Sequence, residues 1–268
     1  SFQDFQGGSL VNIRNISTSE TQHFEADYSP HNIWHLLGGV TRSTQKNTNN
    51  STDFVGQDSY TTNSLDAGVK YNFRSGSSVT VMGHGRSGES SNAVFDNAFD
   101  EREVETKLDW IVSGKSQLNM RAAYLSREYD QFSIHDYSGL VGNIDYSWTP
   151  TGKLRLILSA ATSLSSYQTT GSSYTRVNSL SISPLYAFSD KITMRAQAGI
   201  SERTFLSEGV VPESDRVDWT KTASFGVEWA PLRSVTIGGN LERSSRDSNV
   251  NGLDYTDTTV GVNANLFL

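Results

Sequence analysis

The chain has 268 residues, of which 35% are hydrophobic and 10% are aromatic, and its net charge is -7. This length fits one large β domain or two ordinary ones. The acidic balance argues against a nucleic-acid partner. The sequence contains no cysteine, which excludes disulfides, thiolate metal sites and a cysteine nucleophile. No stretch approaches the ~20 apolar residues that a membrane-spanning helix needs.

Two-residue periodicity recurs from about residue 18 to the end, so we expect an all-β chain with no helix. Short turns rich in Gly, Pro, Asp and Ser join the expected strands into hairpins. In chain order these strands are Thr18–Tyr28, Ile33–Ser43, Tyr60–Phe73, Ser78–Arg86, Glu101–Val112, Gln117–Arg127, Tyr137–Trp148, Lys153–Leu164, Tyr174–Phe188, Ile192–Ser201, Trp219–Trp229, Ser234–Arg243 and Thr256–Leu268.

The last strand, Thr256–Leu268, shows the pattern most clearly. Val260 and Val262 fall on one parity, while Gly261 and Asn263 fall on the other, so one face is apolar and the other is mostly polar. An unpaired apolar strand invites aggregation, whereas in a closed barrel the last strand pairs with the first. This strand alone equally fits a half-buried edge strand of a soluble sandwich.

Two asymmetries favour a membrane barrel. Short turns alternate with long polar loops, which we expect at Thr44–Ser59, Ser87–Asp100, Ser165–Ser173, Phe205–Asp218 and Ser244–Tyr255. Strands that lead into short turns end in a bulky apolar residue about every 40 residues, namely Tyr28, Phe73, Trp110, Trp148, Phe188, Trp229 and Leu268. Solenoids and propellers can share this period, but their own sequence signatures do not recur here.

These features predict an antiparallel up-and-down transmembrane β-barrel of the bacterial outer membrane. Aromatic residues at one height form an interfacial girdle, because their amphipathic rings lie among the lipid headgroups. We expect this girdle to contain Tyr71, Trp110, Tyr146, Trp148, Tyr186 and Trp229.

The whole chain, residues 1–268, is expected to form a single β-barrel domain. About thirteen strands are counted, yet bacterial single-chain barrels have even strand numbers. We therefore expect that the sequence lacks N-terminal strands of a longer protein, or that a short strand lies within Leu10–Ile16.

Charged residues recur on the parity opposite to the apolar one, so we expect them to line a lumen. The candidates are Asp66, Lys70, Arg86, Glu105, Lys107, Asp109, Arg121, Asp145, Arg155, Arg195, Glu228 and Glu242. We expect Glu25, Asp27, Arg42, His84, Glu103, Arg127 and Lys221 on the same side. These residues either form cross-strand ion pairs that order a wet interior or create a mixed-charge passage for a polar solute.

Three of the basic candidates follow short turns by a few residues and are expected at similar depth: Arg121, Arg155 and Arg195. They could meet acidic or hydroxyl-rich sugar with their planar donors. The alternative is that they pair with Asp109, Asp145 and Glu228 on neighbouring strands.

No catalytic residue, metal site or cofactor is predicted, and we expect the protein not to be an enzyme. Of the five histidines, His23 and His35 share a hairpin and could approach a serine, but strand serines are too common for this to be informative. No glycine-rich phosphate loop is present.

Several stretches resemble the EpsL-type outer-membrane barrels that exopolysaccharide operons with exosortase systems encode. The likeness is clearest in FEADYSP with WHLLGG, in YLSREYDQFSIHDYSGLVGNIDYSWTPTGKLRL and in FGVEWAPLRSVTIGGNLERSSRDSNVNGLDY, which cover residues 24–39, 124–156 and 225–255. Family members usually carry further N-terminal strands. The resemblance implies a conduit that secretes exopolysaccharide across the outer membrane, without defined catalytic residues.

We therefore expect an exopolysaccharide conduit in a Gram-negative outer membrane. The expected partners are outer-membrane lipid and lipopolysaccharide, the exopolysaccharide and a periplasmic export protein. Two alternatives stay open: a general or solute-specific porin, and a structural or surface-interaction barrel that acts through its outer loops.

Overall fold

The computed structural model describes residues 4–6, 9–11, 16–48, 60–90, 98–130, 136–169, 172–206 and 216–266. Among these residues, no helix is long and apolar enough to cross a membrane. The strands are β1 (Asp4–Gln6), β2 (Ser9–Val11), β3 (Ile16–Tyr28), β4 (Trp34–Thr48), β5 (Tyr60–Asn72), β6 (Ser78–Ser90), β7 (Phe99–Ser113), β8 (Ser116–Tyr129), β9 (Tyr137–Thr151), β10 (Leu154–Thr169), β11 (Ser172–Ser189), β12 (Ile192–Leu206), β13 (Val217–Leu232), β14 (Val235–Ser248) and β15 (Tyr255–Leu266).

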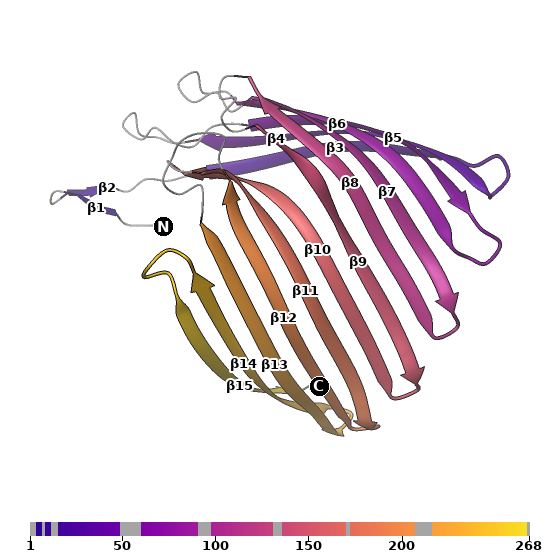
Figure 1. Cartoon of the computed structure of the whole chain (residues 1–268), viewed down its shortest axis with the longest axis vertical. Helices are drawn as coiled ribbons and strands as arrows, with labels where there is room; N and C mark the ends of the chain where they lie inside the picture. The colour runs from indigo at the N-terminus through magenta and orange to yellow at the C-terminus, as the bar shows by residue number, and fades with distance from the viewer. Residues whose placement is uncertain are drawn as a thin grey trace.

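Strands β3 to β15 form one 13-stranded sheet in which each strand pairs with its sequence neighbours. Every pairing is antiparallel, so the predicted up-and-down architecture is confirmed. The sheet is strongly curved but open, and among the described strands β3 and β15 form two edges that do not pair with each other (Figure 1). Strands β1 and β2 form a separate two-stranded sheet.

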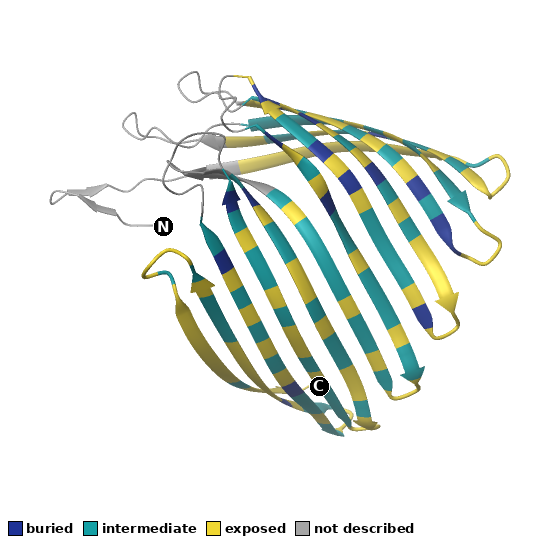
Figure 2. Ribbon diagram, viewed as in Figure 1, coloured by how far each residue is buried: buried dark blue, intermediate teal, exposed yellow. Residues whose placement is uncertain are grey.

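The sheet has two chemically different faces, because successive side chains of a strand point in opposite directions. The cross-strand register aligns these alternations, so that Asp66 lies opposite His84 and His84 opposite Glu103. We call this side the charged face. The other side, the apolar face, carries large exposed hydrophobic side chains such as Val260 (72% exposed) and Leu140 (70% exposed). Alternating exposed and less exposed stripes follow from this arrangement (Figure 2).

The buried hydrophobic core lies on the charged face, near the loop ends of β7, β8 and β9. Six residues form it and three partly buried residues pack against it. The core residues are Phe99, Ala123, Leu125, Tyr129, Tyr137 and Val141, and the packed residues are Tyr60, Leu164 and Tyr174. We call this group the inner core. The sequence pattern does not predict this core, because its six buried residues stand among charges on the parity of the expected polar interior.

The strands begin and end near the predicted positions at the short turns but extend further at the loop ends. β4 continues to Thr48, and β14 continues to Ser248. The predicted long loop Ser244–Tyr255 is therefore wrong in length: only residues 249–254 separate β14 from β15. Both faces are polar in this part of the strands, so the apolar alternation disappears while backbone pairing continues, as at Ser244 opposite Asp257.

The predicted long loop Ser165–Ser173 is wrong in the same way, because β10 continues to Thr169 and β11 begins at Ser172. The other predicted long loops lie partly outside the described residues. Residues 49–59, 91–97 and 207–215 fall outside them, so the predicted loop structure there is not tested. The predicted ends Phe267 and Leu268 of the last strand also lie outside the described residues. A short strand is also predicted within Leu10–Ile16. Leu10 and Val11 belong to β2, which pairs with β1 and not with the main sheet, and residues 12–15 lie outside the described residues.

Candidate functional site

The register places all twelve predicted lumen residues on the charged face. For example, Lys70 aligns through Thr80 with Lys107, and Lys107 aligns with Arg121. On the far side of the sheet, Arg155 aligns through Leu185 with Arg195. That this face lines a lumen remains a prediction.

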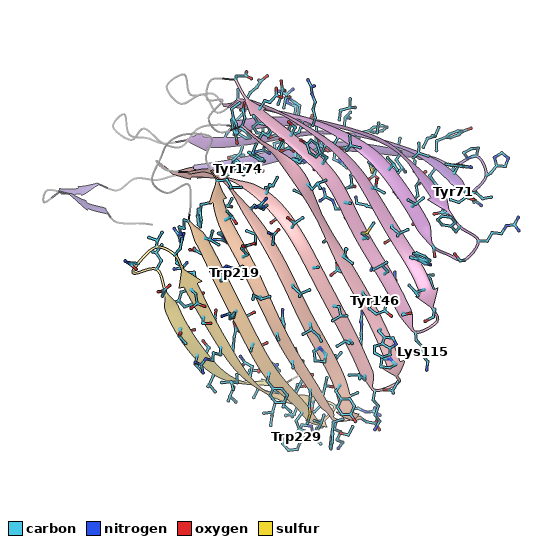
Figure 3. The ribbon with its side chains drawn as sticks, viewed as in Figure 1. Tyr71, Lys115, Tyr146, Tyr174, Trp219 and Trp229 are labelled. Carbon is cyan, nitrogen blue, oxygen red and sulfur yellow. The ribbon has the colours of Figure 1, made fainter. Side chains whose placement is uncertain are left out.

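The six predicted girdle residues lie on the apolar face. Four of them have large exposed fractions, namely Trp110 at 51%, Trp229 at 46%, Trp148 at 42% and Tyr186 at 40%. Tyr71, Tyr146 and Trp229 lie toward the short-turn ends of their strands (Figure 3). Two of the six contact other aromatic rings: the ring centroid of Tyr71 lies 4.7 Å from that of Trp34, and the ring centroid of Tyr186 lies 6.4 Å from that of Phe188.

Two of the additional charged residues were assigned to the wrong face. Arg42 lies opposite Asn63 and shares a side with Val40, on the apolar face. Lys221 shares a side with Phe225 on the same face. Both residues lie toward the loop ends of their strands. The prediction fails at these two positions because, beyond the apolar band, charged side chains occur on both faces of a strand, so a charge there does not mark the interior.

Glu105 on β7 has the most charged neighbours on the charged face, and it is only 3% exposed. Lys107 Nζ lies 2.7 Å from its Oε1. The guanidinium of Arg121 donates to the other carboxylate oxygen and also to Glu103. Two cations therefore compensate the buried carboxylate, which makes its burial tolerable.

His84 extends this network toward β5. Its Nδ1 lies 2.6 Å from Asp66 Oδ1, and its Nε2 lies 3.6 Å from Glu105 Oε1. The hydrogen bond to Asp66 requires a proton on Nδ1, which fixes the orientation of the ring. The network thus crosses three strands, from Asp66 to Glu105.

A second ionic group lies one step closer to the loops. Glu101 is 5% exposed. It accepts hydrogen bonds from Arg86 at 2.7 Å and from Arg127 Nε at 2.8 Å. The Arg127 guanidinium also lies 3.9 Å from the centroid of the Phe99 ring, so a cation–π contact joins the ionic network to the inner core. We call the charged residues of β5 to β8 on this face, from Asp66 to Arg127, the ionic region.

We call the charged face of β10 to β15 the small-polar region. It includes the Arg195–Glu228 pair near the short turns, but charged side chains are few in its middle part. Its side chains are mostly short and uncharged: Ser159, Ser181, Gln197, Gly199, Thr222, Ser224, Gly226, Gly238, Asn240, Gly261 and Asn263. A hydroxyl, amide or backbone surface of this kind can form weak, repeated hydrogen bonds with a polar solute.

Two asparagines lie flat on this surface because glycines stand beside them. Gly238 pairs with Asn263, and Gly261 pairs with Asn240. A Cβ atom at either glycine would lie 2.4 Å from the Oδ1 atom of its asparagine, which no real contact permits. Because the glycines have no side chain, the two amide groups can lie close to the backbone of the neighbouring strand and do not project from the sheet.

The predicted arginine arc separates into three different environments. Arg195 pairs with Glu228 at 2.9 Å, as the pairing alternative predicted. Arg121 pairs with Glu103 and Glu105 rather than with Asp109.

The third arginine, Arg155, donates to Ser147 Oγ at 3.3 Å. Asp145, its predicted partner, instead accepts from Ser159 Oγ at 2.5 Å. Each arginine of the arc therefore has a different degree of charge compensation.

The first short turn brings a serine, a histidine and an aspartate together. His35 Nδ1 lies 2.9 Å from Asp27 Oδ1, and its Nε2 lies 3.5 Å from Ser29 Oγ. However, the Asn72 amide nitrogen donates to the same Nε2 at 2.9 Å. The lone pair that a general base needs is therefore already engaged, and this arrangement is a hydrogen-bonded turn rather than a hydrolytic triad.

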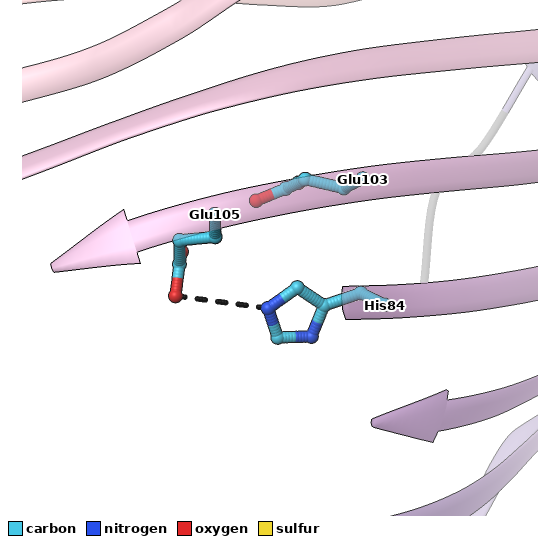
Figure 4. A group of neighbouring side chains, drawn as sticks. All are labelled: His84, Glu103 and Glu105. Atoms are coloured by element: carbon cyan, nitrogen blue, oxygen red, sulfur yellow. Dashed lines mark ion pairs between the residues drawn. The ribbon is translucent and has the colours of Figure 1, made fainter. Parts of the chain in front are cut away.

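Three side chains of the ionic region could also hold a metal ion. His84, Glu103 and Glu105 place one possible ligand atom each within 4.8 Å of one another (Figure 4). Lys107 and Arg121 already bind both carboxylates, so ion pairing explains the group without a metal. The group is not evident from the sequence because its members come from two strands. The shared parity of His84 and Glu103 is the one signal that points to it.

Comparisons with known proteins agree with this architecture. A family model described as "Putative beta-barrel porin 2" matches residues 112–267, more than half of the chain. A sequence search among curated proteins gives no match.

Solved structures with similar folds have very different sequences. The FrpB iron transporter of Neisseria meningitidis in its F5-1 apoprotein form superposes with a TM-score of 0.67 at 10% identity, over 87% of this chain and 45% of that chain. The siderophore receptor PiuA of Acinetobacter baumannii gives a TM-score of 0.62 at 8% identity, over 94% of this chain and 58% of that one. The chain thus spans about half the length of these proteins, and the likeness extends to the fold alone.

Proposed function

The chain belongs to the beta-barrel porin 2 family, and on this premise we propose that it is an outer-membrane conduit for the secretion of exopolysaccharide. In this proposal the apolar face meets lipid, and the charged face lines the passage. The family and the fold support an outer-membrane, porin-like role. The sugar cargo rests on the chemistry of the charged face and on the sequence resemblance to EpsL-type barrels.

The observation that carries the proposal is the combination of paired charges with a small-polar surface. In the ionic region, Glu101 and Glu105 are almost fully buried and held by cations. In the small-polar region, Asn240 and Asn263 lie flat beside glycines. A polyhydroxylated chain passing such a surface finds many weak hydrogen-bond partners and few unpaired charges, so it can slide without being trapped.

A working conduit needs a closed barrel, and the topology restricts how closure occurs. Thirteen antiparallel strands make β3 and β15 run in the same direction. Antiparallel closure therefore needs an odd number of further strands between these edges. We propose that strands preceding the present sequence supply them, which agrees with the even strand numbers of bacterial single-chain barrels.

A general or solute-specific porin is the second candidate. The family match favours it directly, because the description names a porin without a cargo. The Arg195–Glu228 pair is the feature that fits it best, since both side chains are well exposed, at 59% and 46%, and could interact with small charged solutes. A structural barrel that acts through its outer loops is a third possibility, in which no transport is expected.

The test compares cells with and without the gene. If the proposal is correct, deletion lowers exopolysaccharide on the surface and leaves polymer in the periplasm, and complementation restores export. The purified protein in planar bilayers should conduct ions and be blocked by the polymer. Normal secretion with unblocked conductance would favour the porin, and normal secretion without conductance would favour the structural barrel.

A further inference from the structure

The short turns of the sheet share a chemical feature that the transport proposal does not use. Every short turn between β3 and β14 carries one basic side chain. These residues are His31, Arg74, Lys115, Lys153, Lys191 and Arg233, and all are exposed. Within the same turns the one acidic residue is Asp190. A chain with a net charge of -7 therefore has a basic rim at one end.

Three of these turns repeat the same backbone contact. The carbonyl oxygen of the turn lysine accepts a hydrogen bond from the next strand pair: Thr149 N donates to Lys115 at 2.7 Å, and Ala187 N donates to Lys153 at 2.8 Å. The third contact joins Ala230 N to Lys191, also at 2.8 Å. The contacts fix the position of each lysine on the rim.

The side chain of each lysine also donates a hydrogen bond to the same neighbouring strand, to the carbonyl group of the residue that follows the backbone donor. Lys115 Nζ donates to the Pro150 carbonyl at 3.2 Å, and Lys191 Nζ donates to the Pro231 carbonyl at 2.9 Å. Lys153 Nζ reaches the Phe188 carbonyl at 3.5 Å. An ammonium group has three donors, so each lysine keeps donors for another acceptor.

The carbonyl groups that hold these ammonium groups belong to aromatic residues of the apolar face or follow them by two residues. Trp148 precedes Pro150 by two residues, Trp229 precedes Pro231 by two, and Phe188 itself supplies the third carbonyl; their exposed fractions are 42%, 46% and 54%. Lys115 and Trp229 mark this end of the sheet (Figure 3). Exposed aromatic rings of a membrane protein lie at the headgroup level. The ammonium groups therefore lie where phosphodiesters are found.

We propose that this basic rim binds the headgroups of anionic phospholipids in the membrane leaflet on the short-turn side. The inference rests on the proposed membrane location. The rim lysines, held by carbonyl groups beside lipid-facing rings, present fixed positive charge to the phosphodiester of a lipid such as phosphatidylglycerol. The bound lipid would anchor the short-turn end of the barrel and fix its depth in the membrane.

Tryptophan fluorescence can test the proposal at single sites. Trp229 lies beside the Lys191 contact, and Trp219 lies toward the opposite end of β13 (Figure 3). Two versions of the full chain would each keep one of these tryptophans, with Phe at the other four positions. After reconstitution into phosphatidylcholine vesicles, brominated phosphatidylglycerol and brominated phosphatidylcholine are compared as quenchers.

We expect brominated phosphatidylglycerol to bind next to Trp229 roughly fivefold better than brominated phosphatidylcholine, the effect of one basic residue at an anionic surface. Lys191→Gln should remove most of this preference, and Lys191→Arg should keep it. Lys221→Gln, a matched change near Trp219, should leave the ratio at Trp229 unaltered.

Two outcomes would overturn the proposal in different ways. Equal quenching of Trp229 by both lipids, or a preference that survives Lys191→Gln, would show that the rim does not select anionic lipid while the membrane location stands. If neither lipid quenches Trp229, the membrane location itself is wrong and the rim proposal fails with it.

Discussion

The ionic and small-polar regions occupy the same face of one sheet, yet they are built by different means. In the ionic region, Glu105 is 3% exposed and two cations bind it. In the small-polar region, the Arg195–Glu228 pair has side chains that are 59% and 46% exposed. The comparison shows two kinds of polar surface on one face. In the ionic region, long paired side chains fill the surface; in the small-polar region, short uncharged side chains leave it open and able to form weak hydrogen bonds.

The inner core explains why the two regions differ in burial. Phe99, Tyr129 and Tyr137 pack above the ionic region, and Arg127 joins them to it through Phe99. Burial in an apolar environment strengthens the ion pairs but also raises the cost of leaving any charge unpaired. No comparable cluster of buried hydrophobic residues lies over the small-polar region among the described residues.

The largest loss of stability is expected for substitutions on the apolar face, which is hydrophobic behind both the ionic and the small-polar region. Val260→Arg places a charge on the apolar face and should lower the free energy of unfolding by about 2–4 kcal/mol if it lies near the bilayer midplane. Leu158→Arg should act in the same direction. Unfolding in denaturant from liposomes measures both. Asn263→Arg, on the charged face of the same strand as Val260, is the control and should be tolerated far better; equal losses would contradict the face assignment.

The second largest loss of stability is expected when a buried charge of the ionic region is removed. Glu105→Gln removes the carboxylate charge that binds Lys107 and Arg121, and it should cost about 2–3 kcal/mol of unfolding free energy, less than a fully buried pair because both cations can turn toward water. Glu228→Gln is the matched change in the small-polar region and should cost less than about 1 kcal/mol, because that pair is exposed. Denaturant titrations of both variants compare them, and equal costs would contradict the distinction between the regions.

A smaller effect should separate packing from charge in the small-polar region. Gly261→Val forces the exposed Asn240 side chain away from the surface and should cost less than about 1 kcal/mol, because the clashing atom is the end of a side chain that can rotate. Adding Asn240→Ala removes the clashing amide, so the double variant should recover part of the loss. A double-mutant cycle of unfolding free energies measures the coupling. Additive losses would mean that the asparagine and the glycine are independent.

The smallest change in stability is expected for the arginines that lack a buried partner. Arg155→Gln with Arg195→Gln should leave barrel abundance normal while lowering exopolysaccharide on the cell surface, if these donors meet the polymer. Arg121→Gln should instead reduce abundance, because it leaves Glu103 and Glu105 without their shared cation. Immunoblots and a surface-polysaccharide assay give the two readouts. Unchanged secretion in the double variant would make Arg155 and Arg195 structural residues only.

The all-β architecture, the hairpin order and the side of the sheet on which each predicted girdle residue lies follow from the sequence alone. These properties depend on the alternation of side chains along a strand, which is local, and on Gly, Pro, Asp and Ser at the short turns. Even the number of strands in the main sheet follows from counting alternating segments. The twelve predicted residues of the charged face follow from the same parity.

The charge pairs, the position of the core and the ends of the strands do not follow from local alternation, because they depend on how whole strands pair. Arg121 pairs with Glu103 and Glu105 because the register between β7 and β8 brings them together, and no local pattern specifies that register. Arg42 and Lys221, by contrast, lie on the apolar face because they share the parity of Val40 and Phe225, and near the loop ends charged side chains occur on both faces. Local alternation fixes the direction of a side chain, whereas its neighbours come from other strands and depend on how the whole sheet is paired and curved.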